Sequence, residues 1–357
     1  MPGRREHQSV RAVRGAAFAA LLIGGAALAA ANPVDALQRD GEAALQRGES
    51  QQALDAFERA AMLRHSAPIE IGIVRSLMQM GAYRRALGFA GHTAFAHPES
   101  HDGAALYTLL LRLGGQAPVA QRLVEAGLQR APDDVALARA HAVLAAPLAD
   151  ERVQALTALA PSGDRVPPGA SGVGNATLLP DGRHALVPLA QLPADGVLWV
   201  RSGLGRTVRA ERHRVDAQAG VAVLRLAEAM DAPQGATRRP FPGTPAFVVA
   251  FDRASTWPQL HSGFLGNVAG DAAGQWLGVD AGAHGAGAAV FDGSGRLLGM
   301  ALPASGDGRL RFIGLAAASS LLPVAAQAAD VAPNAARGID EVYERGLRTA
   351  LQLIAAR

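Results

Sequence analysis

Two stretches of the chain differ in the period of their hydrophobic and polar residues. Between residues 34 and about 150, apolar side chains recur at helical spacing, as in Ala53, Phe57 and Ala60. From about 165 to 325, short apolar runs alternate with turns rich in Gly and Asp, which is typical of strands. The pattern predicts a helical domain followed by an all-β domain.

The helical stretch repeats with a period of 33 or 34 residues. In each repeat a glycine stands five residues before an alanine: the pairs are Gly48 and Ala53, Gly81 and Ala86, and Gly115 and Ala120. Glycine suits a tight turn, and a small residue lets two helices approach closely. Pro98 and Pro132 each follow their alanine by twelve residues and stop the second helix. We therefore expect three stacked helical hairpins.

The third repeat places Val119, Leu123 and Val124 on its predicted buried face, and Val135–Leu144 would close the stack. The spacing, and above all the stretch Gly48–Ala60, resembles the tetratricopeptide repeat. That resemblance implies an α-solenoid whose concave groove binds extended peptides or partner proteins. The alternative is an array that only packs against the next domain.

The linker Pro161–Gly172 is rich in Pro, Gly and Ser and marks the boundary. Beyond it, four segments read as strands: Val197–Arg201, Val221–Leu226, Ala246–Phe251 and Leu297–Ala301. Asp292–Gly295 predicts a tight hairpin turn, because these residues tolerate positive φ angles. Many short strands without helices between them predict a barrel or sandwich.

The order of these segments resembles the trypsin-like serine proteases, in particular the bacterial periplasmic high-temperature-requirement branch. The matching segments, in order, are Ser171–Leu179, Ala185–Leu192, Asp216–Leu226, Gly243–Phe251, Ser262–Phe264, Val279–Met300 and Phe312–Ser319. The resemblance implies a double β-barrel. The fold class predicted for the whole chain is thus an α-solenoid of helical hairpins followed by a trypsin-like double β-barrel.

The resemblance also locates the three catalytic positions. The histidine position falls on Ala190 and the aspartate position on Gly220. The nucleophile falls on Ala286 when counted back from the following strand, or near Ala288 when counted forward from the preceding one. Acyl transfer by a serine needs a base and a carboxylate that orients it, and alanine and glycine supply neither. We predict a pseudoprotease domain with no catalytic residues.

Four other residues are candidate substitutes for the catalytic groups. His184 is more simply an exposed turn residue, and His284 lies just before the altered loop. Ser294 is more simply a turn residue at a hairpin tip, and Ser262 matches a structural serine of the resembling family.

The loop His284–Ala288 is also shortened where an oxyanion hole would form. Gly285 and Gly287 would still allow a bound peptide backbone to come close. An extended peptide could then add to a strand edge.

Composition removes several classes of chemistry. The chain has no Cys, which excludes disulfides, thiol catalysis and Cys-ligated metals. His213 with Asp216, and His92 with His97 and His101, lack the close spacing of metal-ligand motifs. We therefore predict no metal site and no cofactor.

The N-terminus has the order of a secretory signal. Arg4, Arg5, Arg11 and Arg14 precede the uncharged run Gly15–Ala31, which ends in small residues. We expect residues 1–31 to be a cleaved signal peptide and the protein to be exported to the periplasm; a retained anchor is the alternative. Cleavage removes four Arg and one Glu from a chain of net charge +3, leaving it close to neutral. No nucleic-acid partner is expected, and no membrane contact beyond the export signal.

The C-terminal segment 338–357 allows two interpretations. Ile339–Leu347 is helical in pattern, and the apolar residues of Thr349–Ala355 would form a strand. In trypsin-like proteases a short helix and an apolar strand commonly precede the barrel, so this tail would supply a strand that the Pro-rich segment before residue 170 does not. The simpler interpretation, which we slightly favour, is one amphipathic helix, Asp340–Ala355.

The domains expected from the sequence are thus 1–31, 34–150, 165–325 and 338–357. The predicted function is a non-catalytic binding or scaffold protein of the cell envelope, with a peptide or protein partner. The alternatives are a residual serine endopeptidase of the trypsin-like family acting on envelope proteins, and a structural role in which the barrel is an assembly interface.

Overall fold

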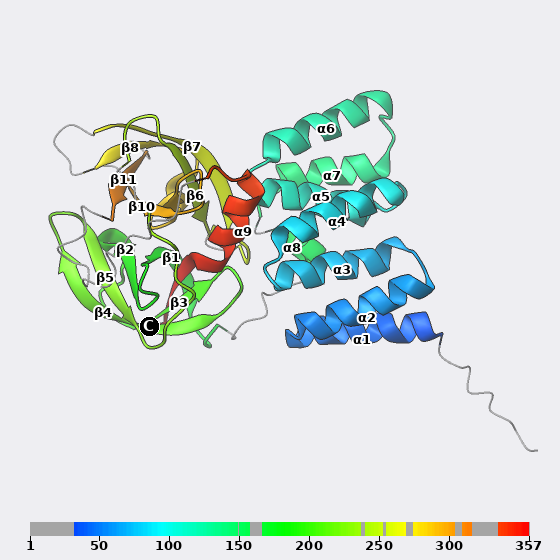
Figure 1. The fold of residues 1–357 in the computed structure, drawn as a ribbon, viewed down its shortest axis with the longest axis horizontal. Helices are drawn as coiled ribbons and strands as arrows, with labels where there is room; N and C mark the ends of the chain where they lie inside the picture. Colours follow the sequence, from blue (N-terminus) through cyan, green and yellow to red (C-terminus); the bar gives the residue numbers. More distant parts are fainter. Residues whose placement is uncertain are drawn as a thin grey trace, which may run out of the picture. The chain divides into compact units, whose positions relative to one another are not determined.

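The computed structural model describes residues 32–148, 150–157, 166–236, 240–252, 255–268, 274–303, 309–315 and 335–356. The expected signal peptide lies outside these residues. Within them, helices come first, strands follow, and a last helix and strand end the chain (Figure 1). In the described part of the chain, no helix has the length and apolar character needed to cross a membrane.

Eight helices come before the first strand: α1 (Pro33–Arg47), α2 (Ser50–Leu63), α3 (Ala67–Gln79), α4 (Tyr83–Ala96), α5 (His101–Leu113), α6 (Ala117–Arg130), α7 (Val135–Ala145) and α8 (Glu151–Thr157). The turns α1–α2, α3–α4 and α5–α6 contain Gly48, Gly81 and Gly115, with φ of 78°, 71° and 79°. A side chain rarely adopts this left-handed conformation, which explains the glycine in every repeat. The three predicted hairpins are confirmed.

The predicted small residues lie where the helices meet. Ala53, Ala86 and Ala120 are all buried. Phe57 is also buried, and its ring fills the space left by two glycines, Gly41 of α1 and Gly72 of α3. A Cβ atom at either glycine would lie within 2.8 Å of that ring. The first hairpin therefore packs on the second around one aromatic side chain.

One prediction about the array is wrong. Val124 is buried, but Val119 is 38% exposed and Leu123 is 52% exposed. Both belong to α6, the second helix of the third hairpin. This helix contacts α5 and α7, and among the described residues no further hairpin covers its outer face.

The strands form two closed antiparallel barrels of six strands each. The first barrel is built from β1 (Ser171–Leu178), β2 (His184–Pro188), β3 (Val197–Ser202), β4 (Thr207–Asp216), β5 (Val221–Leu226) and β12 (Ala350–Ala356). The second is built from β6 (Pro245–Ala250), β7 (Gln259–Val268), β8 (Gln275–Gly278), β9 (Ala289–Phe291), β10 (Leu297–Pro303) and β11 (Leu310–Gly314). A helical region followed by a double β-barrel confirms the predicted fold class. Residues 316–319 of the expected closing strand lie outside the described residues.

The C-terminal tail corrects the simpler sequence interpretation. Residues 339–349 form the helix α9 (Ile339–Thr349), but the chain then turns into β12, so a single helix to Ala355 is wrong. The reason is burial. Leu351 and Leu353 enter the core of the first barrel, and Ile354 is buried as well. A strand buried on both faces reads as a continuous apolar run, which periodicity does not distinguish from a helix.

β12 takes the place of a first strand. In the second barrel, the first and fourth strands pair (β6 with β9), and so do the third and sixth (β8 with β11). Counting the first barrel as β12, β1, β2, β3, β4 and β5 gives the same rule, because β12 pairs with β3 and β2 pairs with β5. The two barrels therefore share one topology once the last strand of the chain is counted first.

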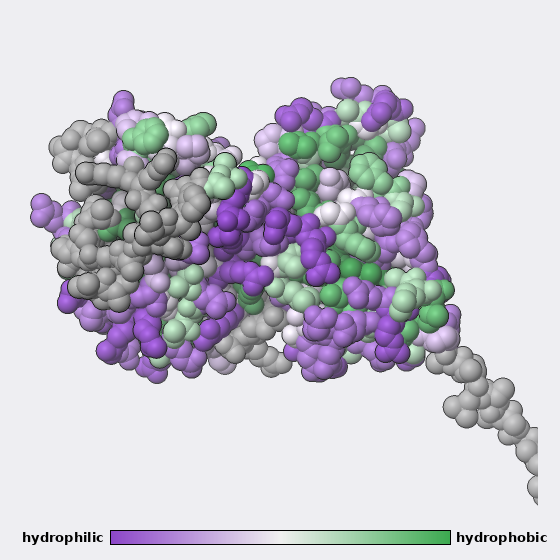
Figure 2. Space-filling model, viewed as in Figure 1, coloured by the Kyte–Doolittle hydropathy of each residue, from purple (hydrophilic) through white to green (hydrophobic). Residues whose placement is uncertain are grey.

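α9 connects this strand to the helical array. The Tyr343 ring packs edge-on against Tyr83 of α4, with ring centroids 4.5 Å apart. The Tyr343 hydroxyl donates to the Pro258 carbonyl, and the Tyr83 hydroxyl donates to the Leu110 carbonyl, both at 2.8 Å. The face of α9 turned to the viewer is hydrophilic (Figure 2).

Glu344 of α9 also contacts the first turn of α4. Its carboxylate accepts the backbone N–H of Arg84 at 2.8 Å, at a helix start whose own cap residue, Ala82, has no capping side chain. Backbone N–H groups of a first helical turn have no partner within the helix, and an anion there is stabilising. α9 therefore both packs against the array and caps one of its helices.

The buried position of β12 predicts a large effect for Leu353→Ala. Truncating a fully buried leucine leaves a cavity and should lower the free energy of unfolding by about 2–5 kcal/mol. Urea unfolding followed by circular dichroism measures it. Val215→Ala, at an exposed position of β4, is the control and should change stability by less than about 0.5 kcal/mol. Equal, small effects would contradict closure of the barrel by β12.

The buried tyrosine predicts sensitivity to alkali. Burial raises the pKa of Tyr343 well above its usual range, so the folded protein must hold this phenol neutral. Stability is complete below pH 10, where unfolded tyrosine is also neutral, and falls as the pH rises above it. Tyr343→Phe should weaken that alkaline loss. It should also cost about 1–3 kcal/mol at neutral pH, because the Pro258 carbonyl loses its donor. Unfolding curves at several pH values test both effects, with the partly buried Tyr107→Phe as control.

Candidate functional site

Ala190 and Gly220, to which the resemblance assigned the histidine and aspartate positions, lie close together at one end of the first barrel. Pro188, the last residue of β2, pairs with Val221, the first residue of β5. The short 3₁₀ helix η1 (Leu189–Gln191) follows β2, and the Leu189 N–H donates to the Gly220 carbonyl at 2.9 Å. Ala190 is exposed, and Gly220 adopts a φ of 70°. The fold thus brings these positions together, but neither carries a group that takes or holds a proton.

The third position reaches the same place from the second barrel. The Gln191 side chain donates to the Ala286 carbonyl at 3.1 Å. Of the two candidate positions, Ala286 is the one whose backbone contacts η1. Ala286 is 3% exposed and Ala288 is 1% exposed, so a nucleophile at either position would be covered.

The loop after η2 (Ala283–Gly285) directs its carbonyl oxygens towards the first barrel. The Asn175 amide of β1 donates to the His284 carbonyl at 2.7 Å and to the Ala286 carbonyl at 3.4 Å. The Thr177 hydroxyl donates to the Gly287 carbonyl at 3.0 Å. An oxyanion is stabilised by converging N–H donors, whereas this loop presents acceptors.

Amide groups of the same loop are used within the second barrel. The Gly287 N–H donates to the Ala301 carbonyl at 2.8 Å, and the Ala288 N–H donates to the Gly285 carbonyl at 3.1 Å. A Cβ at Gly287 would lie 2.3 Å from the Asn175 carbonyl oxygen. The glycine that was expected to admit a peptide backbone instead admits the backbone of β1 itself.

Asn175 and Gln191, which were not among the predicted site residues, join the two barrels here together with Thr177. Asn175 also accepts the Phe251 N–H at 2.7 Å, so its one amide contacts two backbone segments of the second barrel. The available signal was a polar amide inside an apolar strand. A buried amide requires partners, and here the partners come from the other barrel.

His184 is not the exposed turn residue that the sequence suggested. It opens β2, is largely buried, and its Nδ1 lies 2.7 Å from Asp181 Oδ2. Its ring also lies 5.4 Å from that of His213 on β4. Desolvation and, next, the neighbouring His184 lower the pKa of His213. β2 separates His184 from the η1 turn, so this pair is not at the family's catalytic position.

The remaining substitutes are also dispersed. Ser294 donates its hydroxyl to Asp292 at 2.6 Å within the predicted hairpin turn, which confirms its role there. Ser262 is an exposed residue of β7. His284 is exposed, with Nδ1 3.7 Å from Asp252 Oδ1. Asp216 ends β4 and accepts the Ala219 N–H at 2.9 Å, which is a turn contact.

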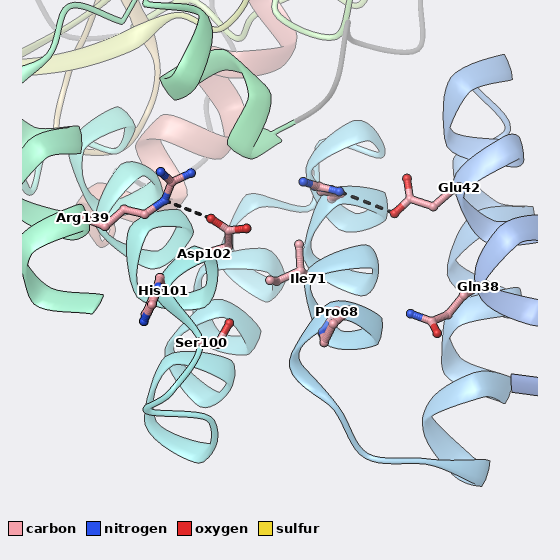
Figure 3. Close-up of a pocket in the computed structure, with 9 residues that line it drawn as sticks. Gln38, Glu42, Pro68, Ile71, Ser100, His101, Asp102 and Arg139 are labelled. Carbon is pink, nitrogen blue, oxygen red and sulfur yellow. Dashed lines mark hydrogen bonds and ion pairs between the residues drawn. The ribbon is translucent and has the colours of Figure 1, made fainter. Parts of the chain in front are cut away.

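The helical array carries a groove with a volume of about 420 Å³. Its lining residues come from the first helix of each hairpin and from α7: Gln38, Glu42, Pro68, Ile71, Arg75, Ser100, His101, Asp102 and Arg139. Figure 3 shows Gln38 and Glu42 on one side and Asp102 and Arg139 on the other. One face of α1, α3, α5 and α7 therefore forms a mainly polar surface, with Pro68 and Ile71 between its polar sides.

Two ion pairs line this groove. Arg139 Nε lies 3.0 Å from Asp102 Oδ1, with both side chains exposed, and Arg75 Nη1 lies 3.5 Å from Glu42 Oε1 (Figure 3). Arg75 also donates to the Leu156 carbonyl at the end of α8. Burial lowers the pKa of Arg75, while the Glu42 carboxylate opposes that effect. Arg75 thus holds α8 against the array, whereas Arg139 and Asp102 remain accessible to a partner.

Residues 173–300 match the family model of the trypsin-like peptidase domain. This segment contains Ala190, Gly220, Ala286 and Ala288. Among solved structures, the chain is similar to the protease domain of MamO from Magnetospirillum magneticum in its apo form. The identity is 17% and the TM-score 0.36, over 45% of this chain and 93% of that one. No curated protein matches the chain.

The geometry predicts that introducing His, Asp and Ser at the three assigned positions does not create hydrolytic activity. The variant Ala190→His, Gly220→Asp, Ala286→Ser should not cleave casein and should not react with a fluorophosphonate. The reason is that position 286 is buried and presents a carbonyl to η1, and losing even one oxyanion donor costs about 10²- to 10³-fold in kcat.

The wild-type chain, tested in parallel, should also remain unlabelled. Labelling of the triple variant at residue 286 would contradict the closed loop. Labelling of the wild type at Ser262 or Ser294 would support a residual hydrolase instead.

Proposed function

We propose that this chain is a non-catalytic binding protein of the cell envelope, in which a tetratricopeptide-like array binds an extended peptide segment and a pseudoprotease domain supports it. The observation that carries the proposal is the groove across α1, α3, α5 and α7, with its exposed Asp102–Arg139 pair. Export to the periplasm and kinship with the high-temperature-requirement branch belong to the same proposal and rest on the sequence patterns.

The groove suits a peptide backbone with mixed charge. Its rim carries carboxylates, guanidinium groups and the amide of Gln38, so donors and acceptors alternate across about 420 Å³. Exposed ion pairs contribute little to folding, about 0–1 kcal/mol, and are available for exchange with a ligand. An extended segment supplies the complementary N–H, C=O and charged groups along its length.

The geometry of the barrels argues against hydrolysis. A serine hydrolase needs a nucleophile that solvent and substrate reach, with amide donors beside it. Here both candidate positions are buried alanines, and Asn175 and Gln191 hold the loop carbonyls. The runner-up, a residual endopeptidase, has the His184–Asp181 pair in its favour, because a carboxylate orients that imidazole. A third role, the barrel as an assembly interface, is compatible with either.

The groove predicts a binding defect for Arg139→Ala. Peptides selected from a display library on the mature chain should bind in fluorescence anisotropy, and Arg139→Ala should weaken them by about fivefold or more. The physical reason is the loss of one charge-assisted hydrogen bond, worth about 1 kcal/mol or more. The peptides should also remain intact on incubation, as judged by mass spectrometry.

The matched control is Arg122→Ala, an exposed arginine of α6 that does not line the groove. Its affinity should equal that of the wild type. Equal loss in both variants, or no selected peptide sensitive to Arg139, would contradict binding in this groove. Cleavage of the selected peptides would instead support the residual endopeptidase.

A further inference from the structure

Three histidines gather around a buried carboxylate in the first two hairpins. Glu70 lies in the first turn of α3, His65 in the loop between α2 and α3, His92 in α4, and His97 directly after α4. Because α3 and α4 are antiparallel, the start of one helix meets the end of the other. The fold thus brings together residues that are up to 32 positions apart.

The distances are those of a ligand cluster. Glu70 Oε1 lies 2.5 Å from His65 Nε2, and 3.6 Å from both His92 Nε2 and His97 Nε2. Ligand atoms of His65, Glu70 and His92 all lie within 4.8 Å of one another. All three imidazoles present the same nitrogen, Nε2, to one carboxylate oxygen.

Burial makes the cluster costly unless a cation is present. Glu70 is 1% exposed, its Oε2 has no hydrogen-bond partner, and the buried His97 Nε2 has none either. An ionised carboxylate out of contact with water needs a positive partner or several donors. The His65 imidazole is placed to donate a hydrogen bond to Oε1, but Oε2 and His97 Nε2 have no partner, whereas a metal ion satisfies the carboxylate and inward-facing nitrogen lone pairs together.

One histidine also has an outer partner. His97 Nδ1 lies 3.5 Å from Glu99 Oε1. A carboxylate on the far nitrogen of a metal-binding imidazole fixes its tautomer and keeps the other nitrogen free to bind. Glu99 thus favours the form of His97 whose Nε2 lone pair faces the cluster.

We propose that His65, Glu70 and His92 bind a Zn²⁺ ion, and that His97, whose Nε2 lies 3.6 Å from Glu70 Oε1 but outside this group of mutually close ligand atoms, moves in as the fourth ligand. Imidazole nitrogens and a carboxylate oxygen are zinc ligands, and four of them suit tetrahedral coordination. Bonds of about 2.0–2.1 Å bring such ligand atoms to about 3.3 Å from one another. The exposed side chains of His65 and His92 have room to adjust: His65 Nε2 moves away from Glu70 Oε1, and His92 Nε2 moves closer to it.

The bound ion would join the α2–α3 loop to the end of α4, and so fix the first hairpin to the second. The prediction of no metal site in this region rested only on the sequence spacing of His92, His97 and His101. His65 and Glu70, which complete the site, come from another part of the repeat.

The test is titration of the untagged mature chain with ZnCl₂ by calorimetry, and with Co²⁺ by visible absorption. We expect one ion per chain, the visible bands of four-coordinate cobalt, and a melting temperature that rises with zinc concentration. Glu70→Gln and the double variant His65→Ala, His92→Ala should each weaken binding by more than the roughly 10- to 100-fold that loss of an outer partner costs.

His141→Ala removes an exposed histidine of α7 and is the matched control, with binding expected to be unchanged. His65 and His92 are more than half exposed, so the double variant should fold normally even if Glu70→Gln does not. Absence of stoichiometric binding, or binding that survives the double variant, overturns the proposal.

Discussion

Closure of the first barrel by the last strand of the chain is the constraint on which the rest of the structure depends. β12 pairs with β1 on one side and β3 on the other, and without it both strands would expose an unpaired edge. Because α9 directly precedes β12, closing the barrel fixes α9 as well. The position of Tyr343, and through it the contact with α4, follows from a strand pairing at the C-terminus.

This arrangement gives α9 two roles that a simple linker would not have. First, the Glu344 carboxylate caps α4. Second, Tyr343 fills the space between the array and the second barrel, and its hydroxyl donates a hydrogen bond to the Pro258 carbonyl. The edge-on contact between Tyr83 and Tyr343 adds about 0.5–1.5 kcal/mol beyond its buried area. The array and the barrels therefore share one buried cluster of side chains, and removing the tail would affect both.

The sequence predicted well where one residue type answers one local requirement. Gly48, Gly81 and Gly115 give the repeat turns, because a positive φ is rarely compatible with any other residue. The strands were predictable from runs such as Val221–Leu226. Sequence-based prediction failed where burial depends on a segment that is distant in the sequence. Leu123 looked buried because its pattern is amphipathic, but nothing described covers α6, and residues 350–356 looked helical until the barrel that buries them was known.

The candidate catalytic site shows the same limit of sequence-based prediction. The resemblance assigned the catalytic positions to Ala190, Gly220 and either Ala286 or Ala288, because the lack of a functional side chain is visible in a sequence. The side chains that contact this loop could not be predicted, because Asn175 and Gln191 reach its carbonyls only once the two barrels pack together. The contact between the barrels uses the carbonyl oxygens of residues 284, 286 and 287, while the N–H groups of Gly287 and Ala288 are bonded within the second barrel, so the polar backbone groups of this loop are used in packing.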